Sequence, residues 1–294
     1  MINPFAARGR ARRTWPRVRT VLQQAGWTLE EVVTGSPQEA EARARAAGGA
    51  WDVVVAVGGD GTSHWVINGL LRADSPPPLA LIPEGTANDF ARSLGIPLSP
   101  IAAARALGRA VRRRVDVGEV NGRYYATISG VGFDAEVARR VNRWPRWIRG
   151  TAVYVAGILI TLATYRPVEV TLVVDGSSRR VRLYLLAAAN TNWYGGGMYM
   201  APHARIDDGL LAVVYATDLT PLQTLRVLPS VFSGRHLLHP KVAHTTARTV
   251  QVDSATPLAI HADGEVVGTV PASFRVIPQA LDVLVPAPSA GDAR

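Results

Sequence analysis

Residues 53–62 read VVVAVGGDGT and decide the fold of the first part of the chain. The continuous apolar run at 53–57 is typical of a strand that is buried on both faces, as in parallel sheets. Three glycines follow, and a helical pattern begins after them. In such a turn the backbone N–H groups can approach a phosphate closely, and the amino end of the helix adds a favourable dipole. The alternative is a tight strand-to-helix turn that needs positive φ angles.

An acidic residue in this turn narrows the choice of ligand. Asp60 would repel a phosphate group unless a cation such as Mg²⁺ lay between them, so the turn favours a metal–nucleotide complex. A second buried strand is expected at 79–82, and the sequence PEGTANDFAR follows it at 83–92. Open parallel sheets bind their ligands at such strand ends. Asn88 or Asp89 could instead serve only to cap the next helix.

Strand and helix patterns alternate around these two loops as far as about residue 112. We expect a helix that starts at 14–16, a strand at 27–34, a helix with a capping box from residue 36, and a short helix from residue 99. This alternation predicts an α/β domain, with a parallel sheet covered by helices on both faces.

The pattern changes after residue 112, where strands joined by turn signals dominate. Such strands predict a mainly antiparallel β-sandwich, interrupted by helices at about 136–164 and 221–234. The turn signals are Asn121-Gly122, Asp175-Gly176, Asp208-Gly209 and Asp263-Gly264.

The expected domain boundaries follow from this change. The α/β domain covers 1–115 and is completed by 276–286, and the β-sandwich domain covers 116–275. A tail rich in Pro, Ala and Ser, residues 287–294, is expected to be disordered.

Composition excludes several classes of function. The 294 residues leave room for about two domains, and the absence of cysteine excludes disulfides, thiolate metal sites and thiol nucleophiles. The histidines do not cluster as metal ligands, and His236 and His239 are expected at the surface. No Gly-x-Ser-x-Gly sequence supports a serine hydrolase. The net charge of +9 favours partners that carry phosphate, namely nucleic acid, nucleotide or an anionic membrane.

An arginine-rich segment beside an apolar one bears on membrane contact. Arginines and tryptophans alternate between 139 and 149, and the apolar stretch 151–164 follows. That stretch is shorter than the roughly 20 residues that span a bilayer. The arginine-rich amino-terminal run contains no apolar stretch of 7–15 residues and is not expected to act as a secretory signal. Arginine and tryptophan suit a membrane interface, where they meet lipid phosphate and headgroups. The alternative is a core helix behind a solvated basic turn, and both descriptions apply if the helix lines a cleft for lipid tails.

The two loops resemble those of the lipid kinase family that contains soluble bacterial diacylglycerol kinases and eukaryotic sphingosine kinases. The first loop alone is ambiguous, because NAD kinases and phosphofructokinases carry similar sequences, whereas the second loop is specific. The remaining matches are Asn3-Pro4, GVGFD at 130–134, residues 202–210 with Asp207-Asp208-Gly209, and DGE at 263–265. The chain departs from the family pattern at Ala6-Ala7, where Ser-Gly is usual.

The resemblance implies a set of site residues. Glu265 would be the general base, although Asp60 remains an alternative for that role and would also reach Mg²⁺. A second, structural Mg²⁺ would be bound by Asp208 and the backbone carbonyls of Arg205 and Leu210. The residues expected to bind ATP are Asn3, Thr34, Gly58, Gly59, Asp60, Gly61, Thr62, Ser63, His64, Thr86 and Asn88.

The implied activity is transfer of the γ-phosphate of ATP to a lipid hydroxyl, with diacylglycerol as the expected acceptor and phosphatidic acid as the product. The alternative acceptors are a sphingoid base, phosphatidylglycerol or NAD. A more distant alternative is a protein that binds nucleotide or nucleic acid without catalysis. The expected partners are the lipid, ATP, a transient anionic membrane surface and, as an open alternative, a second copy in a homodimer, without nucleic acid. The expected location is cytoplasmic, peripheral at the inner membrane face.

Overall fold

The computed structural model describes residues 1–4, 6–144 and 151–287. Contacts between residues divide the chain into two units. The first unit comprises Met1–Val115 and the segment from Gln279 onward, and the second comprises Asp116–Pro278. Two strands, β3 (Ala110–Val120) and β13 (Ala272–Pro286), contain residues of both units.

The first unit is built on a small parallel sheet. The strand β1 (Val54–Gly58) pairs in parallel with β2 (Leu79–Pro83), and Val283 of β13 pairs in parallel with Leu79. Ile2 forms parallel bridges with both Val57 and Val33. The two predicted strands are therefore confirmed, each within one residue at either end.

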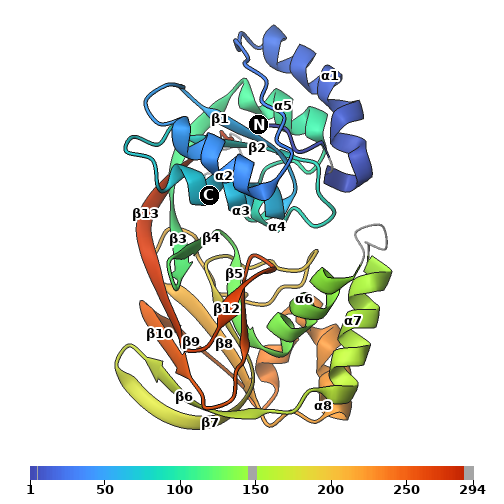
Figure 1. Cartoon of the computed structure of the whole chain (residues 1–294), viewed down its shortest axis with the longest axis vertical. Helices are drawn as coiled ribbons and strands as arrows, with labels where there is room; N and C mark the ends of the chain where they lie inside the picture. Colours follow the sequence, from blue (N-terminus) through green and yellow to red (C-terminus); the bar gives the residue numbers. More distant parts are fainter. Residues whose placement is uncertain (5, 145–150, 288–294) are drawn as a thin grey trace, which may run out of the picture. The chain divides into compact units, whose positions relative to one another are not determined.

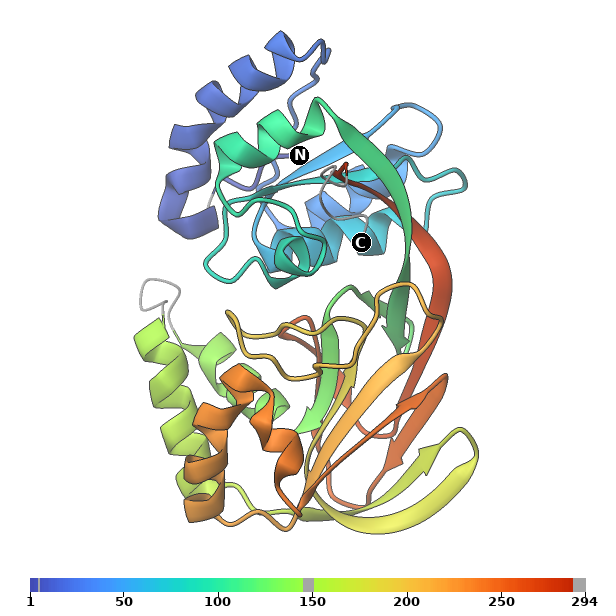
Figure 2. The ribbon, with the colours of Figure 1, turned by 180° about the vertical axis from the view of Figure 1, so that it is seen from behind.

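Helices cover this sheet on both faces, as predicted. Figures 1 and 2 show α1 and α5 on one face and α2 and α3 on the other. The helices are η1 (Ala6–Gly9), α1 (Arg10–Gln24), α2 (Pro37–Ala46), α3 (Asp60–Leu70), α4 (Asp89–Ser93) and α5 (Pro100–Leu107). Ser36 caps α2, because its side-chain oxygen accepts from the N–H of Glu39.

Two predictions in this unit were wrong. The helix expected to start at 14–16 begins at Arg10, and Pro16 lies inside it. Ala11 and Val18 are both buried on either side of the proline, so packing keeps the helix continuous despite the missing N–H. The strand expected at 27–34 is reduced to one bridge at Val33, since 27–32 has no regular structure.

The second unit is mainly antiparallel. The strands other than β3 and β13 are β4 (Arg123–Tyr125), β5 (Ile128–Gly132), β6 (Val168–Val174), β7 (Ser177–Ala189), β8 (Leu211–Thr217), β9 (Val242–Ala247), β10 (Thr249–Asp253), β11 (Ala259–Ala262) and β12 (Glu265–Thr269). β7 pairs with β5, β6 and β8, and β5 continues to β11 and β12. Apolar side chains from both ends of this sheet form one buried core, which includes Val131, Leu172, Leu186 and Phe274.

Predicted turns join several of these strands. Three of the predicted pairs connect neighbouring strands, and both residues of each pair have positive φ, as two-residue hairpins of this kind require. They are Asn121-Gly122, Asp175-Gly176 and Asp263-Gly264. These three turn predictions are confirmed. At Asp208-Gly209 only the glycine has a positive φ, and the turn leads into β8.

Helices gather at one side of the second unit (Figure 1). The helix expected at 136–164 is two helices, α6 (Phe133–Arg143) and α7 (Thr151–Thr164), which pack against β7 and β8 through residues such as Phe133, Leu162 and Tyr184. The helix expected at 221–234 is α8 (Pro221–Val227) followed by η2 (Leu228–Ser233) and η3 (Arg235–Leu238). None of the described helices has both the length and the apolar character that crossing a bilayer takes.

Candidate active-site residues

The first glycine-rich loop places the start of a helix at the end of β1. α3 begins at Asp60, and the carbonyl of Gly59 accepts from the N–H groups of Thr62 at 2.9 Å and Ser63 at 3.1 Å. The first N–H groups of any helix have no acceptor within the helix, and the positive end of its dipole lies there. The positive end of the α3 dipole therefore lies at this turn.

The N-terminal segment is tied to the same loop. Nδ2 of Asn3 donates to Oγ1 of Thr62 at 3.0 Å, and the N–H of Asn3 donates to the carbonyl of Val57 at 3.1 Å. Thr34 is buried, and its N–H donates to the carbonyl of Ile2 at 3.0 Å. The structure thus brings Asn3 and Thr34 to the strand that leads into the loop.

Side chains predicted to contact nucleotide differ in exposure. Thr86 is exposed, whereas Thr62 and Ser63 are buried. His64 is only 1% exposed, and its ring meets Trp65 edge to face at 5.3 Å. The structure therefore buries His64 as a whole, which does not favour the predicted contact of this residue with nucleotide.

The two loops touch each other through glycines. A Cβ atom at Gly59 would lie 2.7 Å from Cα of Gly85, so neither backbone leaves room for a side chain. Asn88, at φ 54°, closes the second loop, because Oδ1 accepts from the N–H of Gly85 at 2.8 Å and Nδ2 donates to its carbonyl at 3.0 Å. Oδ1 of Asp60 accepts from the N–H of Phe90 at 3.1 Å. The loops are therefore one packed structure.

This contact predicts the effect of one methyl group. We expect Gly85→Ala to destabilise the first unit by about 1–3 kcal/mol, because the added Cβ overlaps the backbone of Gly59 and Oδ1 of Asn88. ATP affinity should fall as well. Urea unfolding and calorimetric titration with ATP measure both effects. Gly35→Ala is the matched control, since its Cβ would meet nothing closer than 3.5 Å, and an equal effect in the two variants would contradict the packing argument.

The ion pair between Arg10 and Glu84, beside the second loop, was not predicted from the sequence. Glu84 is fully buried, and Nε of Arg10 lies 3.1 Å from its Oε2. The N–H of Glu84 also donates to the carbonyl of Gly58 at 2.8 Å. Because the two side chains are 74 positions apart, no local pattern points to the pair.

In the second unit, the Asp-Gly-Glu turn is held from one side by Asp263. Its carboxylate accepts from the N–H groups of Ala126 at 2.9 Å and Thr127 at 2.8 Å, and from the Thr127 hydroxyl at 2.5 Å. Glu265 follows at the start of β12 and is partly exposed. Asp263 thus fixes the turn that precedes the partly exposed Glu265.

A second acidic loop in this unit offers oxygen ligands. Asp208 is exposed, and its Oδ1 accepts from the N–H of Leu210 at 3.0 Å. Asp116 is buried and holds the loop, since Oδ2 accepts from the N–H of Gly209 at 2.6 Å. A carboxylate with the carbonyls of Arg205 and Leu210 is an all-oxygen donor set, which suits Mg²⁺. The described residues contain no group of three or more His, Cys, Asp or Glu side chains placed for a metal ion.

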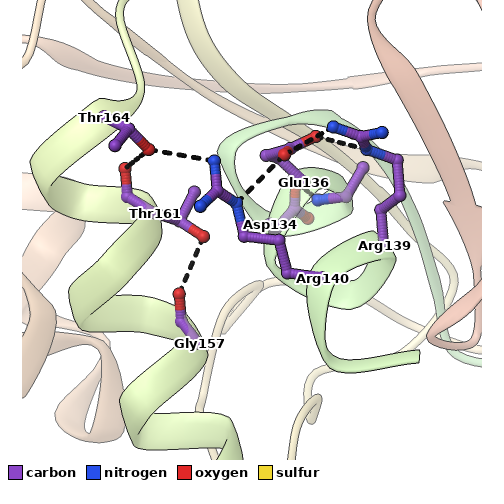
Figure 3. A network of polar contacts seen from close by, with 8 residues as sticks. Asp134, Glu136, Arg139, Arg140, Gly157, Thr161 and Thr164 are labelled. Atoms are coloured by element: carbon purple, nitrogen blue, oxygen red, sulfur yellow. Dashed lines mark hydrogen bonds and ion pairs between the residues drawn. The ribbon is translucent and has the colours of Figure 1, made fainter. Parts of the chain in front are cut away.

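Charged side chains also fix α6 (Figure 3). Glu136 accepts from Nε of Arg139 at 2.7 Å and from Nε of Arg140 at 3.1 Å, and Arg140 continues to the Thr164 hydroxyl of α7 at 2.9 Å. Burial would raise the pKa of the Glu136 carboxyl, but the two arginines outweigh burial and lower it. Two of the arginines expected at a membrane thus bind within the fold. The part of that segment at 145–150, like the tail at 288–294, lies outside the described residues.

One surface prediction was wrong. His236 is buried, and its Nε2 lies 3.0 Å from the carbonyl of Met200, to which it donates. Burial lowers the pKa of this imidazole, although the hydrogen bond to Met200 acts in the opposite direction. His239 is partly exposed.

Comparison with known proteins identifies the class of protein to which this two-domain fold belongs. The profile described as "Diacylglycerol kinase catalytic domain" matches residues 1–120, and "YegS C-terminal NAD kinase beta sandwich-like domain" matches residues 127–285. The chain belongs to the diacylglycerol kinase family and is an ATP-dependent lipid kinase.

Similar proteins extend over almost the whole chain. A diacylglycerol kinase of Mycobacterium tuberculosis (strain H37Rv) is 34% identical, covering 97% of this chain and 94% of its own length. A diacylglycerol kinase of Bacillus subtilis (strain 168) is 31% identical with the same coverage. A solved structure from Bacillus anthracis (strain Sterne) has a TM-score of 0.81 at 23% identity over 96% of this chain and 93% of its own, which shows the same fold.

Proposed function

We propose that the chain transfers the γ-phosphate of ATP to the hydroxyl of diacylglycerol and so forms phosphatidic acid. The observation that carries this proposal is the 34% identity, over 97% of the chain, to a protein named diacylglycerol kinase. In this proposal residues 1–115 with 276–286 bind the nucleotide, and residues 116–275 bind the lipid.

The first unit binds the phosphates of ATP. The N–H groups at the start of α3 and the backbone of Gly58, Gly59 and Gly61 face the phosphates, and the Thr86 hydroxyl adds a donor. Asn3 and Asn88 act by holding the two loops in place, and Thr34 acts by holding the N-terminal segment at Ile2, as their hydrogen bonds support.

Oxygen ligands for Mg²⁺ are supplied by both acidic loops. Asp60 would hold the nucleotide-associated ion through water, and Asp208 with the carbonyls of Arg205 and Leu210 would hold a structural ion. When bound with ATP, Mg²⁺ neutralises negative charge on the phosphate oxygens. The donor types fit this ion, because carboxylate and carbonyl oxygens are its preferred protein ligands.

Glu265 accepts the proton of the acceptor hydroxyl. The hydroxyl oxygen forms a bond to the γ-phosphorus while the bond from that phosphorus to the β–γ bridging oxygen breaks, and ADP leaves with the bridging oxygen. A carboxylate in hydrogen-bond reach of the hydroxyl takes the proton late in this step. The hydrogen bonds of Asp263 support the role, because they fix the turn before Glu265.

Labelled ATP tests the acceptor directly. The protein is incubated with γ-labelled ATP, Mg²⁺ and a total-lipid extract, and in parallel with micelles that contain diacylglycerol, sphingosine or phosphatidylglycerol. We expect label in phosphatidic acid. Label in another lipid, with none in phosphatidic acid, would overturn the proposed acceptor.

Membrane contact is proposed to be peripheral, at the cytoplasmic face of the inner membrane. The second unit exposes large apolar side chains on its helices, among them Leu159 and Ile160 of α7, Leu222 and Leu225 of α8, and Leu238 of η3. With the net charge of +9, such a face suits an anionic bilayer.

Flotation with vesicles tests this contact. Binding should increase with the fraction of anionic lipid and decrease with added salt, because exposed charges are screened within about 10 Å at 0.1 M salt. The double variant Leu222→Ser, Leu225→Ser should bind more weakly, whereas Trp51→Ser, an exposed apolar residue of the first unit, should not. Equal binding to neutral vesicles at high salt would contradict the prediction.

A further inference from the structure

A buried histidine lies just before the Asp-Gly-Glu turn. His261 of β11 is 0% exposed, and its Nε2 lies 2.9 Å from Oδ2 of Asp134, in the first turn of α6. The other ring nitrogen, Nδ1, accepts from the N–H of Gly264 at 3.3 Å. Gly264 immediately precedes Glu265. One imidazole ring therefore links α6 to the turn that carries the proposed base.

These two contacts define which nitrogen carries the hydrogen. A backbone N–H can only donate, so Nδ1 of His261 is the unprotonated nitrogen. Nε2 then carries the hydrogen that the carboxylate of Asp134 accepts, and the hydrogen bond at one nitrogen sets the state of the other. Asp134 thereby keeps Nδ1 available as the acceptor for Gly264.

Neighbouring residues pack closely around the side chains of His261 and Asp134. Gly130 of β5 is the strand partner of His261, and a Cβ there would lie 2.6 Å from Oδ2 of Asp134 and 2.9 Å from Nε2 of His261. The Tyr194 ring stacks on the imidazole, with centroids 5.4 Å apart and planes at 25°. The backbone carbonyl of Leu186 would lie 2.7 Å from the same Cβ, so the pair and the neighbouring strand together require glycine at position 130.

Both ends of this connection are anchored. Figure 3 shows Asp134 on α6 beside Glu136, which pairs with Arg140 of the same helix, and Arg140 in turn donates to the Thr164 hydroxyl of α7. At the other end, the carboxylate of Asp263 holds the turn through Thr127. The turn is therefore fixed by Asp263 at one residue and by His261 at the next, Gly264.

We propose that His261 and Asp134 are positioning residues for Glu265, an inference that rests on the proposed role of Glu265 as the base. His261 has no exposed surface, so it acts through the turn rather than on the substrate. Displacing a catalytic group by about 1 Å can reduce the rate roughly 100-fold. Loss of the Gly264 contact should therefore lower kcat and leave the KM for ATP unchanged.

Two substitutions separate the two contacts of the ring. His261→Gln keeps a donor near Nε2 for Asp134 but has no acceptor near Nδ1, and we expect kcat to fall roughly 10- to 100-fold. His261→Asn places Oδ1 near Nδ1 and keeps the acceptor for Gly264, so it should retain most of kcat. Thermal unfolding of both variants accompanies the kinetics. Equal losses of kcat in the two variants, in step with their losses of stability, would overturn the proposal.

Coupling to Glu265 separates positioning from general structural damage. In a Glu265→Gln background, His261→Gln should reduce kcat no further, because the group it positions is already gone. Losses that multiply would overturn the proposal. Wild-type kcat in His261→Gln, with Glu265→Gln impaired, refutes this inference alone, whereas wild-type kcat in Glu265→Gln refutes the proposed base.

Nuclear magnetic resonance provides a readout without turnover. Two-bond ¹H–¹⁵N spectra of the wild-type chain should show the His261 ring protonated at Nε2 and bare at Nδ1. Asp134→Asn should move the ring hydrogen to Nδ1 in part, since an amide can donate to Nε2. A wild-type ring protonated at Nδ1 would overturn the proposal whatever the kinetics.

Discussion

Asp60→Asn should lower kcat/KM roughly 10²- to 10³-fold, about 3–4 kcal/mol of transition-state stabilisation, while the protein stays folded. The asparagine oxygen can still accept from the N–H of Phe90, as Oδ1 of Asp60 does at 3.1 Å, so the variant removes only the charge. The charged carboxylate of Asp60 is the group proposed to hold the nucleotide-associated Mg²⁺ through water. Steady-state kinetics with varied ATP and Mg²⁺ measure the loss.

Asp60→Ala removes the acceptor as well as the charge. It should show the same catalytic loss together with lower stability, by about 1 kcal/mol for the lost hydrogen bond. Asp52→Asn is the matched control, because Asp52 is an exposed carboxylate near the start of β1. If Asp60→Asn keeps more than about a tenth of kcat/KM, a loss under about 1.4 kcal/mol, Asp60 does not hold the metal.

Glu265→Gln should lower kcat roughly 10²- to 10⁴-fold, about 3–5 kcal/mol, with ATP affinity unchanged. Glutamine keeps the shape of the side chain but cannot accept the proton of the lipid hydroxyl. Steady-state kcat and calorimetric ATP binding are measured together. Glu169→Gln, which alters an exposed carboxylate of β6 in the same unit, serves as the control.

Two outcomes would reassign the base. Near-wild-type turnover in Glu265→Gln would make the Asp-Gly-Glu stretch an ordinary hairpin turn. A larger kcat loss in Asp60→Asn than in Glu265→Gln, at equal ATP affinity, would move the base role to Asp60.

Local sequence signals were sufficient for the strands and turns nearest the proposed site. The run at 53–57 and its neighbour at 79–82 are apolar throughout because both faces of their strands are covered, so β1 and β2 could be predicted within a residue. Asp263-Gly264 tolerates the positive φ angles of its hairpin, and this preference is local as well.

Contacts between distant residues could not be predicted in the same way. Whether 27–34 forms a strand depends on a partner, and among the described residues only Ile2 supplies one. His236 looked like a surface residue because its hydrogen-bond partner, the carbonyl of Met200, lies 36 positions away. Pro16 looked like a helix start because the buried Ala11 upstream carries no pattern of its own.

The residues of the proposed site likewise fall into those that local sequence predicts and those that it does not. Both glycine loops and the Asp-Gly-Glu turn are short motifs that can be recognised in sequence. The supporting side chains are not, since Glu84 is reached by Arg10 and His261 by Asp134 across 74 and 127 positions. A buried charge or ring of this kind is identified by its partner and not by its neighbours in the chain.

The contact between Gly59 and Gly85 has a consequence for engineering and for evolution. Because each glycine occupies the space that a side chain on the other would need, neither position can vary alone. If only one of the two loops were replaced by the loop of a kinase with another nucleotide preference, a side chain at position 59 or 85 of the new loop would overlap the glycine retained in the other loop. Redesign of nucleotide selectivity in this chain should therefore exchange residues 58–62 and 83–90 as one cassette.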